Sequence, residues 1–291
     1  MPQNLLVTGA NGQLGNEMQR IVAANPDKVN AFFTDVDTLD ITDAAAVRAF
    51  IEHNAIDVIV NCAAYTAVDR AEDDMVLCAK LNIDAVANLA SAARDFGAKV
   101  LHISTDYVFD GFEHRPYEES DEPNPRSTYG TTKLQGEREL LKYAPDSIIV
   151  RTAWLYSPFG KNFVKTMLAL GESRDRLSVV CDQVGTPTYA ADLAQAIATV
   201  VFAPQWVPGI FNFSNEGVCS WYDFAVAIVR HSNIDCQVTP IATVDYPTAA
   251  ERPHYSVLDK TRFKATFSAT IPHWEDGLVR CLNRINLNSI N

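Results

Sequence analysis

The chain has 291 residues, of which 47% are apolar and 21% are charged, an ordinary balance for a globular protein with one large core or two modest ones. A formal net charge of −12 and a sequence pI near 4.9 argue against nucleic acid as a partner. No uninterrupted apolar run reaches membrane-spanning length, and the first residues lead directly into an apolar strand, so we expect neither a membrane span nor a signal peptide.

The first half of the chain alternates between predicted strands and predicted helices. Apolar runs typical of strands lie at 4–8, 30–34, 56–61, 99–104 and 147–151, and helical patterns lie at 13–24, 43–54, 76–96 and 128–143. This βαβ alternation predicts an α/β fold with a Rossmann-type doubly wound parallel sheet. The acidic, proline-rich segment 113–126 predicts a surface loop.

The alternation weakens after Trp154. Further strands are predicted at 179–181 and 210–213, and further helices at 190–202 and 222–231. We expect residues 1–150 to form the Rossmann domain, with segments of about 178–215 returning to it. Residues 151–291 would mainly form a smaller, interleaved C-terminal lobe.

The strand predicted at 4–8 runs directly into Gly9-Ala10-Asn11-Gly12-Gln13-Leu14-Gly15 and then into a helix. Its three glycines permit a tight turn and let backbone N–H groups approach a pyrophosphate at the helix N-terminus. A lone glycine pattern can also be an ordinary loop, but a strand before it and a helix after it are the context that dinucleotide binding requires. The pattern predicts a dinucleotide cofactor with its pyrophosphate over residues 12–14.

An acidic residue is expected at the end of the second strand, where it would bind the ribose hydroxyls of the cofactor. Asp35 occupies this position, and Asp37 is a second candidate. A carboxylate there opposes a 2′-phosphate, and the glycine loop contains no Arg or Lys. The sequence therefore favours NADH, or tolerance of both NADH and NADPH.

The strand predicted at 99–104 ends in the side chains of Ser104, Thr105 and Asp106. An open α/β sheet binds its ligands at the carboxyl ends of its strands, so either hydroxyl could bond to a substrate carbonyl oxygen. A turn or a helix cap is the alternative interpretation of this run.

Tyr129 and Lys133 are four residues apart in the helix predicted at 128–143. Positions i and i+4 share a helix face, so the phenol and the ammonium can point into one cleft. A nearby cation lowers the pKa of a tyrosine, which can then donate a proton to an alkoxide. Taken alone, the pair could equally be an aromatic and a charged residue on a half-exposed helix.

Several segments together resemble the dTDP-4-dehydrorhamnose reductase family of the extended short-chain dehydrogenase/reductases. They occur in order at 60–72, 104–111, 129–137, 151–156, 162–168, 182–188 and 252–254. The resemblance implies an oxidoreductase that uses NADPH or NADH to reduce the C4 ketone of dTDP-4-dehydro-L-rhamnose, giving dTDP-L-rhamnose. Tyr129 would donate the proton, Lys133 would hold the nicotinamide ribose and keep the pKa of the tyrosine low, and Thr105 would bond to the C4 oxygen.

The resemblance also implies ligand contacts residue by residue. Cofactor contacts are implied for Gly9, Gly12, Gln13, Leu14, Gly15, Asp35, Asp40, Ile41, Ala64, Tyr65, Thr66, Tyr129 and Lys133. Substrate contacts are implied for Thr105 and Asp106 in the Rossmann domain and for Trp154 and Arg252 in the C-terminal, mainly substrate-binding lobe.

Two of the substrate contacts have plain structural alternatives. Trp154 offers a flat apolar face to a deoxysugar, but it could equally be a core tryptophan. Arg252 offers a guanidinium to the diphosphate, but it could instead form a surface ion pair with Glu251. The family pattern has two arginines before the proline, whereas this chain has Glu251-Arg252-Pro253, which removes one cation. Asp69 and Arg70 could shape the pocket or mark the start of a helix.

By resemblance, a homodimer bridged by a metal such as Mg²⁺ is possible, with Glu17 as one acidic ligand. The six histidines and six cysteines show no metal-ligand spacing. We expect the cysteines to be reduced, structural thiols of a cytoplasmic protein.

Three other functions fit the same motifs. The chain could be a reductase or epimerase of another nucleotide sugar. It could be a non-catalytic NADP-binding regulatory subunit that resembles the β subunit of methionine adenosyltransferase. An isoflavone-type or steroid-type reductase fits least well, because the acidic loop and residues 162–167 do not suggest a wide lipophilic pocket.

Overall fold

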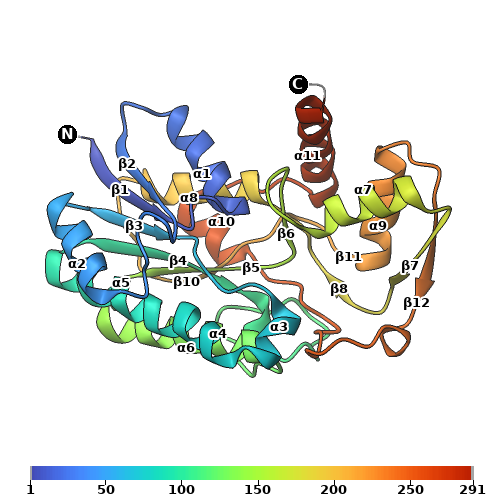
Figure 1. The fold of residues 1–291 in the computed structure, drawn as a ribbon, viewed down its shortest axis with the longest axis horizontal. Helices are drawn as coiled ribbons and strands as arrows, with labels where there is room; N and C mark the ends of the chain where they lie inside the picture. Colours follow the sequence, from blue (N-terminus) through green and yellow to red (C-terminus); the bar gives the residue numbers. More distant parts are fainter. Residues whose placement is uncertain (1, 290–291) are drawn as a thin grey trace.

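The computed structural model describes residues 2–289 and has a six-stranded parallel sheet at its centre (Figure 1). The strands lie side by side in the order β2 (Val29–Thr34), β1 (Gln3–Thr8), β3 (Val58–Asn61), β4 (Lys99–Thr105), β5 (Ile148–Thr152) and β10 (Gly209–Asn212). The direction in which successive strands are added reverses between β1 and β3, and such a switch point opens a crevice at the carboxyl ends of the strands. The predicted fold class is confirmed.

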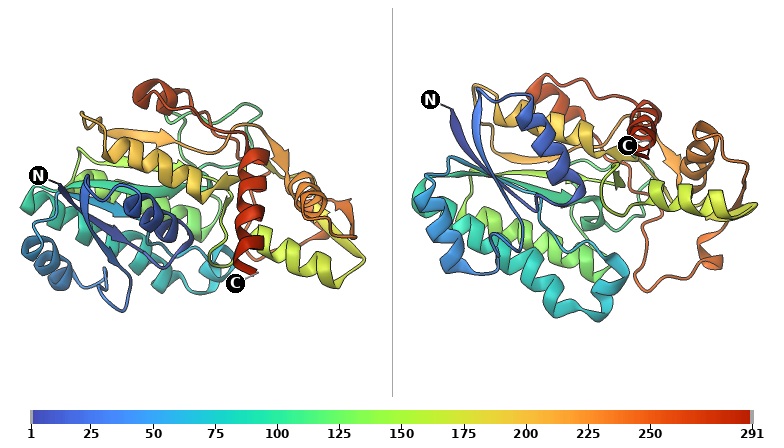
Figure 2. Two further views of the ribbon diagram at one scale, coloured as in Figure 1. Left: turned by 90° about the horizontal axis from the view of Figure 1, so that it is seen from above. Right: turned by 45° about the horizontal axis from the view of Figure 1, so that its top comes forward.

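Helices cover both faces of the sheet, as Figures 1 and 2 show. One layer contains α1 (Gln13–Ala23), α8 (Ala190–Val201) and α10 (Thr261–Phe267), and the other contains α2 (Ala44–His53), α5 (Ala85–Phe96) and α6 (Thr128–Tyr143). The alternation of side chains along β1 explains the two layers. Leu5 and Val7 join the core beneath α1 and α8, whereas Leu6 joins the core beneath α2 and α5.

The helix predicted at 76–96 is one continuous run that contains α4 (Met75–Ala79), a π-helical turn at Lys80–Asp84 and α5. By length and composition alone, Met75–Phe96 is the one helical run among the described residues that could cross a membrane. In the structure this run packs against α2 and α6 in the helical layer. The short helix α3 (Val68–Asp73) precedes it.

The smaller lobe contains α7 (Phe163–Ser173), α9 (Trp221–His231) and three short strand pairs. These pairs are β7 (Arg176–Val180) with β12 (Gln237–Ile241), β8 (Val184–Gly185) with β11 (Cys219–Ser220), and β6 (Leu155–Tyr156) with β9 (Thr188–Tyr189). The strand expected at 179–181 thus begins earlier, and it pairs outside the central sheet. Within 178–215, α8 and β10 are the segments that join the large lobe.

The last helix, α11 (Trp274–Ser289), connects the smaller lobe to the large one. Arg284 donates to the buried carboxylate of Glu17 in α1, and Arg280 donates to Asp192 in α8. Two ion pairs therefore fix α11 against the layer of helices that covers the sheet.

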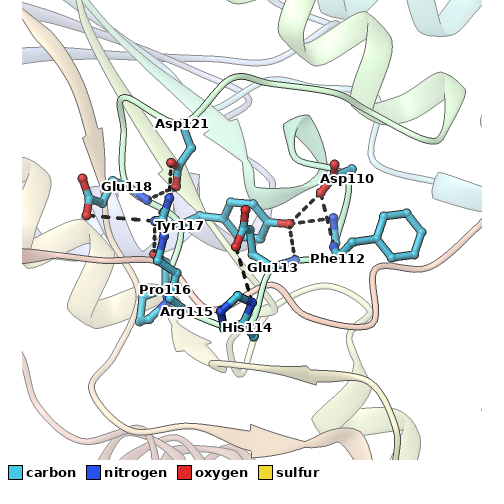
Figure 3. Close-up of polar contacts among 10 residues, drawn as sticks. Asp110, Phe112, Glu113, His114, Arg115, Pro116, Tyr117, Glu118 and Asp121 are labelled. Carbon is cyan, nitrogen blue, oxygen red and sulfur yellow. Dashed lines mark hydrogen bonds and ion pairs between the residues drawn. The ribbon is translucent and has the colours of Figure 1, made fainter.

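The segment 113–126 forms a loop, as predicted, but a buried tyrosine anchors it (Figure 3). The Tyr117 hydroxyl accepts from the backbone N–H groups of Gly111 and Glu113 and donates to Asp110. Its ring stacks on Phe109 with 4.3 Å between the ring centroids. These contacts tie the loop to the residues that follow β4.

Candidate active site

A cleft of about 940 Å³ opens at the carboxyl ends of the central strands, at the switch point of the sheet. Most of the side chains predicted to bind ligands line it. These are Gly9, Gly12, Gln13, Leu14, Gly15, Asp35, Asp40, Ile41, Ala64, Thr66, Thr105, Asp106, Tyr129, Lys133 and Trp154. Tyr65 and Arg252 are not among the residues that line the cleft.

The glycine loop is packed so closely at Gly9 and Gly15 that a side chain would not fit at either position. Gly9 has a φ of +65°, and a Cβ there would lie 2.7 Å from the backbone nitrogen of Ala63. A Cβ on Gly15 would overlap the carbonyl oxygen of Gly9. Gly12 stands at the N-cap of α1 and has no side chain to cap it, so the first turn keeps N–H groups that can bind phosphate. These residues fit the pyrophosphate of a dinucleotide.

Asp35 lies directly after β2, at the ribose end of the loop. Its carboxylate accepts from the backbone N–H groups of Asn11 and Val36, both at 2.9 Å. Asp40 also lines the cleft, and hydrogen bonds from Thr42 hold the pKa of Asp40 below its ordinary value. Asp37 is exposed and does not line the cleft.

The segment after β3 divides between the cleft and the protein interior. Ala64 and Thr66 line the cleft, whereas Tyr65 packs its ring against Ala71, Cys78 and Tyr129. The Asn82 side chain bonds to both the backbone N–H and the carbonyl of Tyr65. The Tyr65 ring therefore packs in the interior, and the contact of Tyr65 with the cofactor that the resemblance implies stays a prediction.

The predicted catalytic residues meet where β4 ends and α6 begins. Thr105 is the last residue of β4, and Ser127 caps α6 by accepting from the backbone N–H of Gly130 at 3.1 Å. A Cβ on Gly130 would overlap the carbonyl oxygen of Tyr107, so a glycine is needed for this close approach. As a result, Tyr129 and Lys133 face the cleft beside Thr105.

The protonation equilibria of this pair differ from those expected. Burial raises the pKa of Tyr129 above its ordinary value, and a hydrogen bond with Thr105 offsets part of that rise. Burial also lowers the pKa of Lys133 to about 8. The lysine nitrogen donates to the Ile103 carbonyl at 2.7 Å and contacts the ring of His102 at 3.2 Å. Within the chain itself, desolvation is the largest effect on the pKa of Tyr129, and the expected effect of Lys133 on that pKa stays a prediction.

Asp106 is a second buried acid at the same strand end. Burial raises its pKa to about 7, although the Thr105 hydroxyl donates to its Oδ1 at 2.9 Å. Its Oδ2 has no hydrogen-bond partner within the described part of the chain. Asp106 lines the cleft as a residue, whereas its Oδ2 atom is itself buried.

Trp154 lines the cleft from the side of the smaller lobe. Its backbone has a φ of +49°, and its ring stacks on Trp221 of α9 with 3.5 Å between ring centroids and 7° between planes. A Cβ on Gly185 would overlap the same ring. The indole is thus clamped on one face, and only its remaining surface can meet a sugar.

Arg252 forms an ion pair with Asp69, and Glu251 pairs with Arg126 instead. One nitrogen of the Arg252 guanidinium is buried without a partner among the described residues. The sequence interpretation missed Lys161, which lines the cleft and comes one residue before Asn162, the N-cap of α7. It also missed that Asn162 donates to Gln13 at 3.0 Å and so joins the smaller lobe to the glycine loop.

Glu17, the expected metal ligand, is buried in the described chain. Its side chain is 2% exposed and is bonded by Arg284. Among residues 2–289, no group of three or more His, Cys, Asp or Glu side chains could hold a metal ion. The role of Glu17 as a ligand of a shared Mg²⁺ stays a prediction.

Comparisons with known proteins agree with this geometry. A family model described as the RmlD substrate binding domain matches residues 3–287. A dTDP-4-dehydrorhamnose reductase from Aggregatibacter actinomycetemcomitans is 41% identical, over 94% of this chain and 96% of its own length. A probable dTDP-4,6-dihydroxy-2-methyloxan-3-one 4-ketoreductase from Streptomyces antibioticus is also 41% identical, over 94% of this chain and 92% of its own.

Among solved structures, a dTDP-4-dehydrorhamnose reductase from Bacillus anthracis, crystallised in complex with NADP, superposes with a TM-score of 0.94. It is 38% identical, and the match covers 98% of this chain and 100% of that one. Both the sequence and the fold match along nearly the whole length, and the chain therefore belongs to the dTDP-4-dehydrorhamnose reductase family of oxidoreductases.

Proposed function

We propose that this chain reduces the C4 ketone of dTDP-4-dehydro-L-rhamnose to the alcohol, with NADPH as the reductant. The observation that carries the proposal is the meeting of Thr105, Tyr129 and Lys133 in the cleft that also contains the glycine loop. The name and the NADP complex of the relative from Bacillus anthracis support the choice of substrate and cofactor.

The residues of the cleft have separate tasks in this reaction. When bound, the reduced nicotinamide supplies the hydride for C4. Thr105 donates to the C4 oxygen and orients the ketone, and Tyr129 gives its phenolic proton to the oxygen as negative charge develops there. Lys133 positions the ribose and stabilises the tyrosine after it loses its proton. Asp106 binds a sugar hydroxyl through the oxygen that has no other partner among the described residues.

The anionic groups of both ligands need local cations, because the chain is acidic overall. Among the residues that line the cleft, Lys133 and Lys161 are the basic ones. We propose that Lys161 binds a phosphate at the rim and that Trp154 packs against the sugar. Arg252 would reach the diphosphate only if its pair with Asp69 opens, so its part in binding is the weakest of the predicted contacts.

NADPH is the proposed cofactor, and NADH should also be accepted. The Asp35 carboxylate is bonded by two backbone N–H groups, which offset part of its repulsion of a 2′-phosphate. The carboxylate can still bind the ribose hydroxyls of NADH.

A second candidate is reduction of a different dTDP-4-keto sugar by the same residues. The 4-ketoreductase from Streptomyces antibioticus is as identical to this chain as the rhamnose relative is, although its name gives a different sugar. The two candidates share the reaction at C4 and differ in what packs against Trp154.

The test measures oxidation of NADPH by absorbance, with dTDP-4-dehydro-L-rhamnose generated in situ. Tyr129→Phe should lower turnover by about 10²–10⁴-fold while NADPH still binds, because only the proton donor is removed. Tyr143→Phe, at the far end of the same helix, is the matched control and should leave turnover unchanged. If Tyr129→Phe keeps full turnover, the tyrosine is not the proton donor. If the unaltered chain binds NADPH but does not turn over this sugar, the second candidate is favoured.

A further inference from the structure

A chain of buried polar groups runs behind Lys133, from β1 across the sheet to α6. The Thr8 hydroxyl lies 2.7 Å from Asn61 Oδ1, and Asn61 Nδ2 lies 3.0 Å from Nδ1 of His102. His102 Nε2 then lies 3.2 Å from the nitrogen of Lys133. His102 is 0% exposed and Lys133 is 1% exposed, so water cannot easily repair a mismatch between them.

The orientation of the Asn61 amide is fixed by a group that can only donate. The backbone N–H of Ala63 points at Asn61 Oδ1 at 3.1 Å, so this atom must be the amide oxygen. The NH₂ group of Asn61 therefore faces His102 and donates to its Nδ1. A neutral imidazole that accepts at Nδ1 carries its proton on Nε2, which points at Lys133.

The Nε2–H tautomer needs an acceptor, and an ammonium has none. Only the neutral amine of Lys133 can accept this hydrogen bond while it still donates to the Ile103 carbonyl. The alternative tautomer would set the N–H on Nδ1 against the amide NH₂ of Asn61. With an ammonium at Lys133, either tautomer of His102 therefore leaves two hydrogen-bond donors facing one another, at Lys133 or at Asn61. Release of a proton by Lys133 removes this conflict.

Other groups that face Lys133 shift its pKa, some upward and some downward. Burial keeps His102 neutral by holding its pKa well below its ordinary value, and burial lowers the pKa of Lys133. Glu137 on α6 favours the ammonium, but Arg151 on β5 binds that carboxylate in a bidentate pair that is 2% exposed at both ends. Cys78 on α4 adds a smaller effect in the same direction as Glu137, and Tyr129 lies one helical turn away on α6.

We infer that Asn61 fixes His102 in the Nε2–H tautomer and that His102 thereby stabilises the neutral amine of Lys133. His102 is a positioning residue in this scheme, since it acts through the lysine. The inference extends the role that the proposed function gives to Lys133. Lys133 therefore titrates near pH 8. Its positive charge beside Tyr129 is lost as the pH rises through its pKa.

Two variants should raise the pKa of Lys133 by different routes. His102→Gln removes the ring and can present an amide oxygen to the ammonium. Asn61→Asp places a carboxylate oxygen beside Nδ1, which draws the ring proton to that nitrogen and turns Nε2 into an acceptor for the ammonium. His53→Gln, on the surface end of α2, is the matched control.

The first measurement is independent of catalysis. NMR of protein labelled with ¹⁵N-histidine and ¹³Cε-lysine reports the His102 tautomer and the titration of Lys133, with signals assigned by their loss in His102→Gln and Lys133→Arg. The unaltered chain should show the Nε2–H tautomer and a lysine that titrates near pH 8. Both test variants should titrate at least about one pH unit higher, a tenfold change in the equilibrium, and Asn61→Asp should show the Nδ1–H tautomer. An imidazolium, an Nδ1–H tautomer in the unaltered chain, or a lysine that titrates at the same pH in all three proteins would overturn the inference.

The second measurement is the pH profile of NADPH oxidation. The alkaline limb of kcat should move upward by the same interval in His102→Gln and stay in place in His53→Gln, whereas loss of packing alone would lower kcat at every pH. If the chain turns over no keto sugar, the profile is lost but the NMR result still decides the inference. Failure of the proposed function and failure of this inference are thus distinguishable. Thermal unfolding identifies a variant that has lost its fold, and the other variant then supplies the test.

Discussion

The cofactor half of the cleft is built from residues that are close together in the sequence, whereas the substrate half is built from residues that the fold brings together. In the cofactor half, Gly9 and Gly15 pack on each other within one loop. In the substrate half, Trp154 is clamped between Gly185 and Trp221. A short motif therefore predicts the first half well and the second half poorly, because only the first half is determined by local backbone geometry.

The largest effect should follow from a methyl group in the cofactor half. In Gly15→Ala the new Cβ overlaps the carbonyl oxygen of Gly9, so the loop must move away from its position at the N-terminus of α1. We expect NADPH affinity to fall by about 100-fold or more, since phosphate binding depends on these N–H groups. Fluorescence titration with NADPH measures this affinity.

Gly97→Ala is the matched control for this change. Gly97 ends α5 with a φ of +73°, but nothing lies within 4 Å of a Cβ there. The substitution should lower the free energy of unfolding by about 1 kcal/mol and leave NADPH affinity unchanged. Equal losses of affinity in the two variants would mean that backbone strain, and not the packing of the loop, controls cofactor binding.

Burial of Asp106, where the two halves of the cleft meet, should lower the free energy of unfolding by an amount that depends on pH. The pKa of Asp106 is raised from 3.8 to about 7 in the folded chain. Between those two pH values the unfolded chain releases the proton and the folded chain keeps it, so burial of Asp106 destabilises the fold progressively as the pH rises. Asp106→Asn should therefore be more stable than the unaltered chain by up to about 4 kcal/mol at pH 8, and about as stable below pH 4.

Urea unfolding at several pH values measures this difference. Asp37→Asn, an exposed carboxylate, is the control and should show no such dependence. A constant stability difference between pH 4 and pH 8 would show that the carboxyl of Asp106 titrates normally. The variant should also bind the sugar more weakly if the free oxygen of Asp106 is a ligand contact.

The sequence was sufficient for the fold and for bringing the proposed catalytic residues to one cleft, because both depend on local patterns. Alternating apolar residues predicted the central strands, and the i, i+4 spacing brought Tyr129 and Lys133 to one face. The direction of a side chain was harder to predict. Tyr65 turns inward because Asn82 holds its backbone, and Arg252 meets Asp69 across the fold.

The protonation of the catalytic pair was also beyond the sequence. Spacing shows that a lysine is near a tyrosine, but burial determines the pKa of each, and burial depends on the whole fold. The same reason explains why the raised pKa of Asp106 could not be expected from the run of Ser104, Thr105 and Asp106 alone.

The substrate half should respond to a change that does not touch the ligand directly. In Trp221→Ala the Trp154 ring loses the partner on which it stacks, so it becomes free to leave the position where it meets the sugar. The KM for the keto sugar should rise by about tenfold, while NADPH affinity stays constant. Steady-state kinetics and NADPH titration measure the two halves separately.

Trp206→Ala is the matched control. Trp206 packs against the core of the large lobe, and its indole N–H donates to the carbonyl of Asp146. It should affect stability and leave the KM for the sugar unchanged. A parallel rise of KM in both variants would mean that general loosening, and not the stack on Trp154, is responsible.

The smallest effect should come from the ribose end of the cofactor half. In Asp35→Ala the repulsion of a 2′-phosphate and the bond to the ribose hydroxyls are both lost, so the ratio of kcat/KM for NADPH over that for NADH should rise about three- to tenfold. The Asn11 N–H also loses its acceptor, which should weaken the binding of both cofactors slightly.

Asp37→Ala removes an equal charge two residues away that does not line the cleft, and it should change the ratio little. If both variants change the ratio equally, the discrimination is a long-range effect of charge, and raising the ionic strength should then abolish it in both. If only Asp35→Ala changes it, a single carboxylate held by the glycine loop sets the cofactor preference.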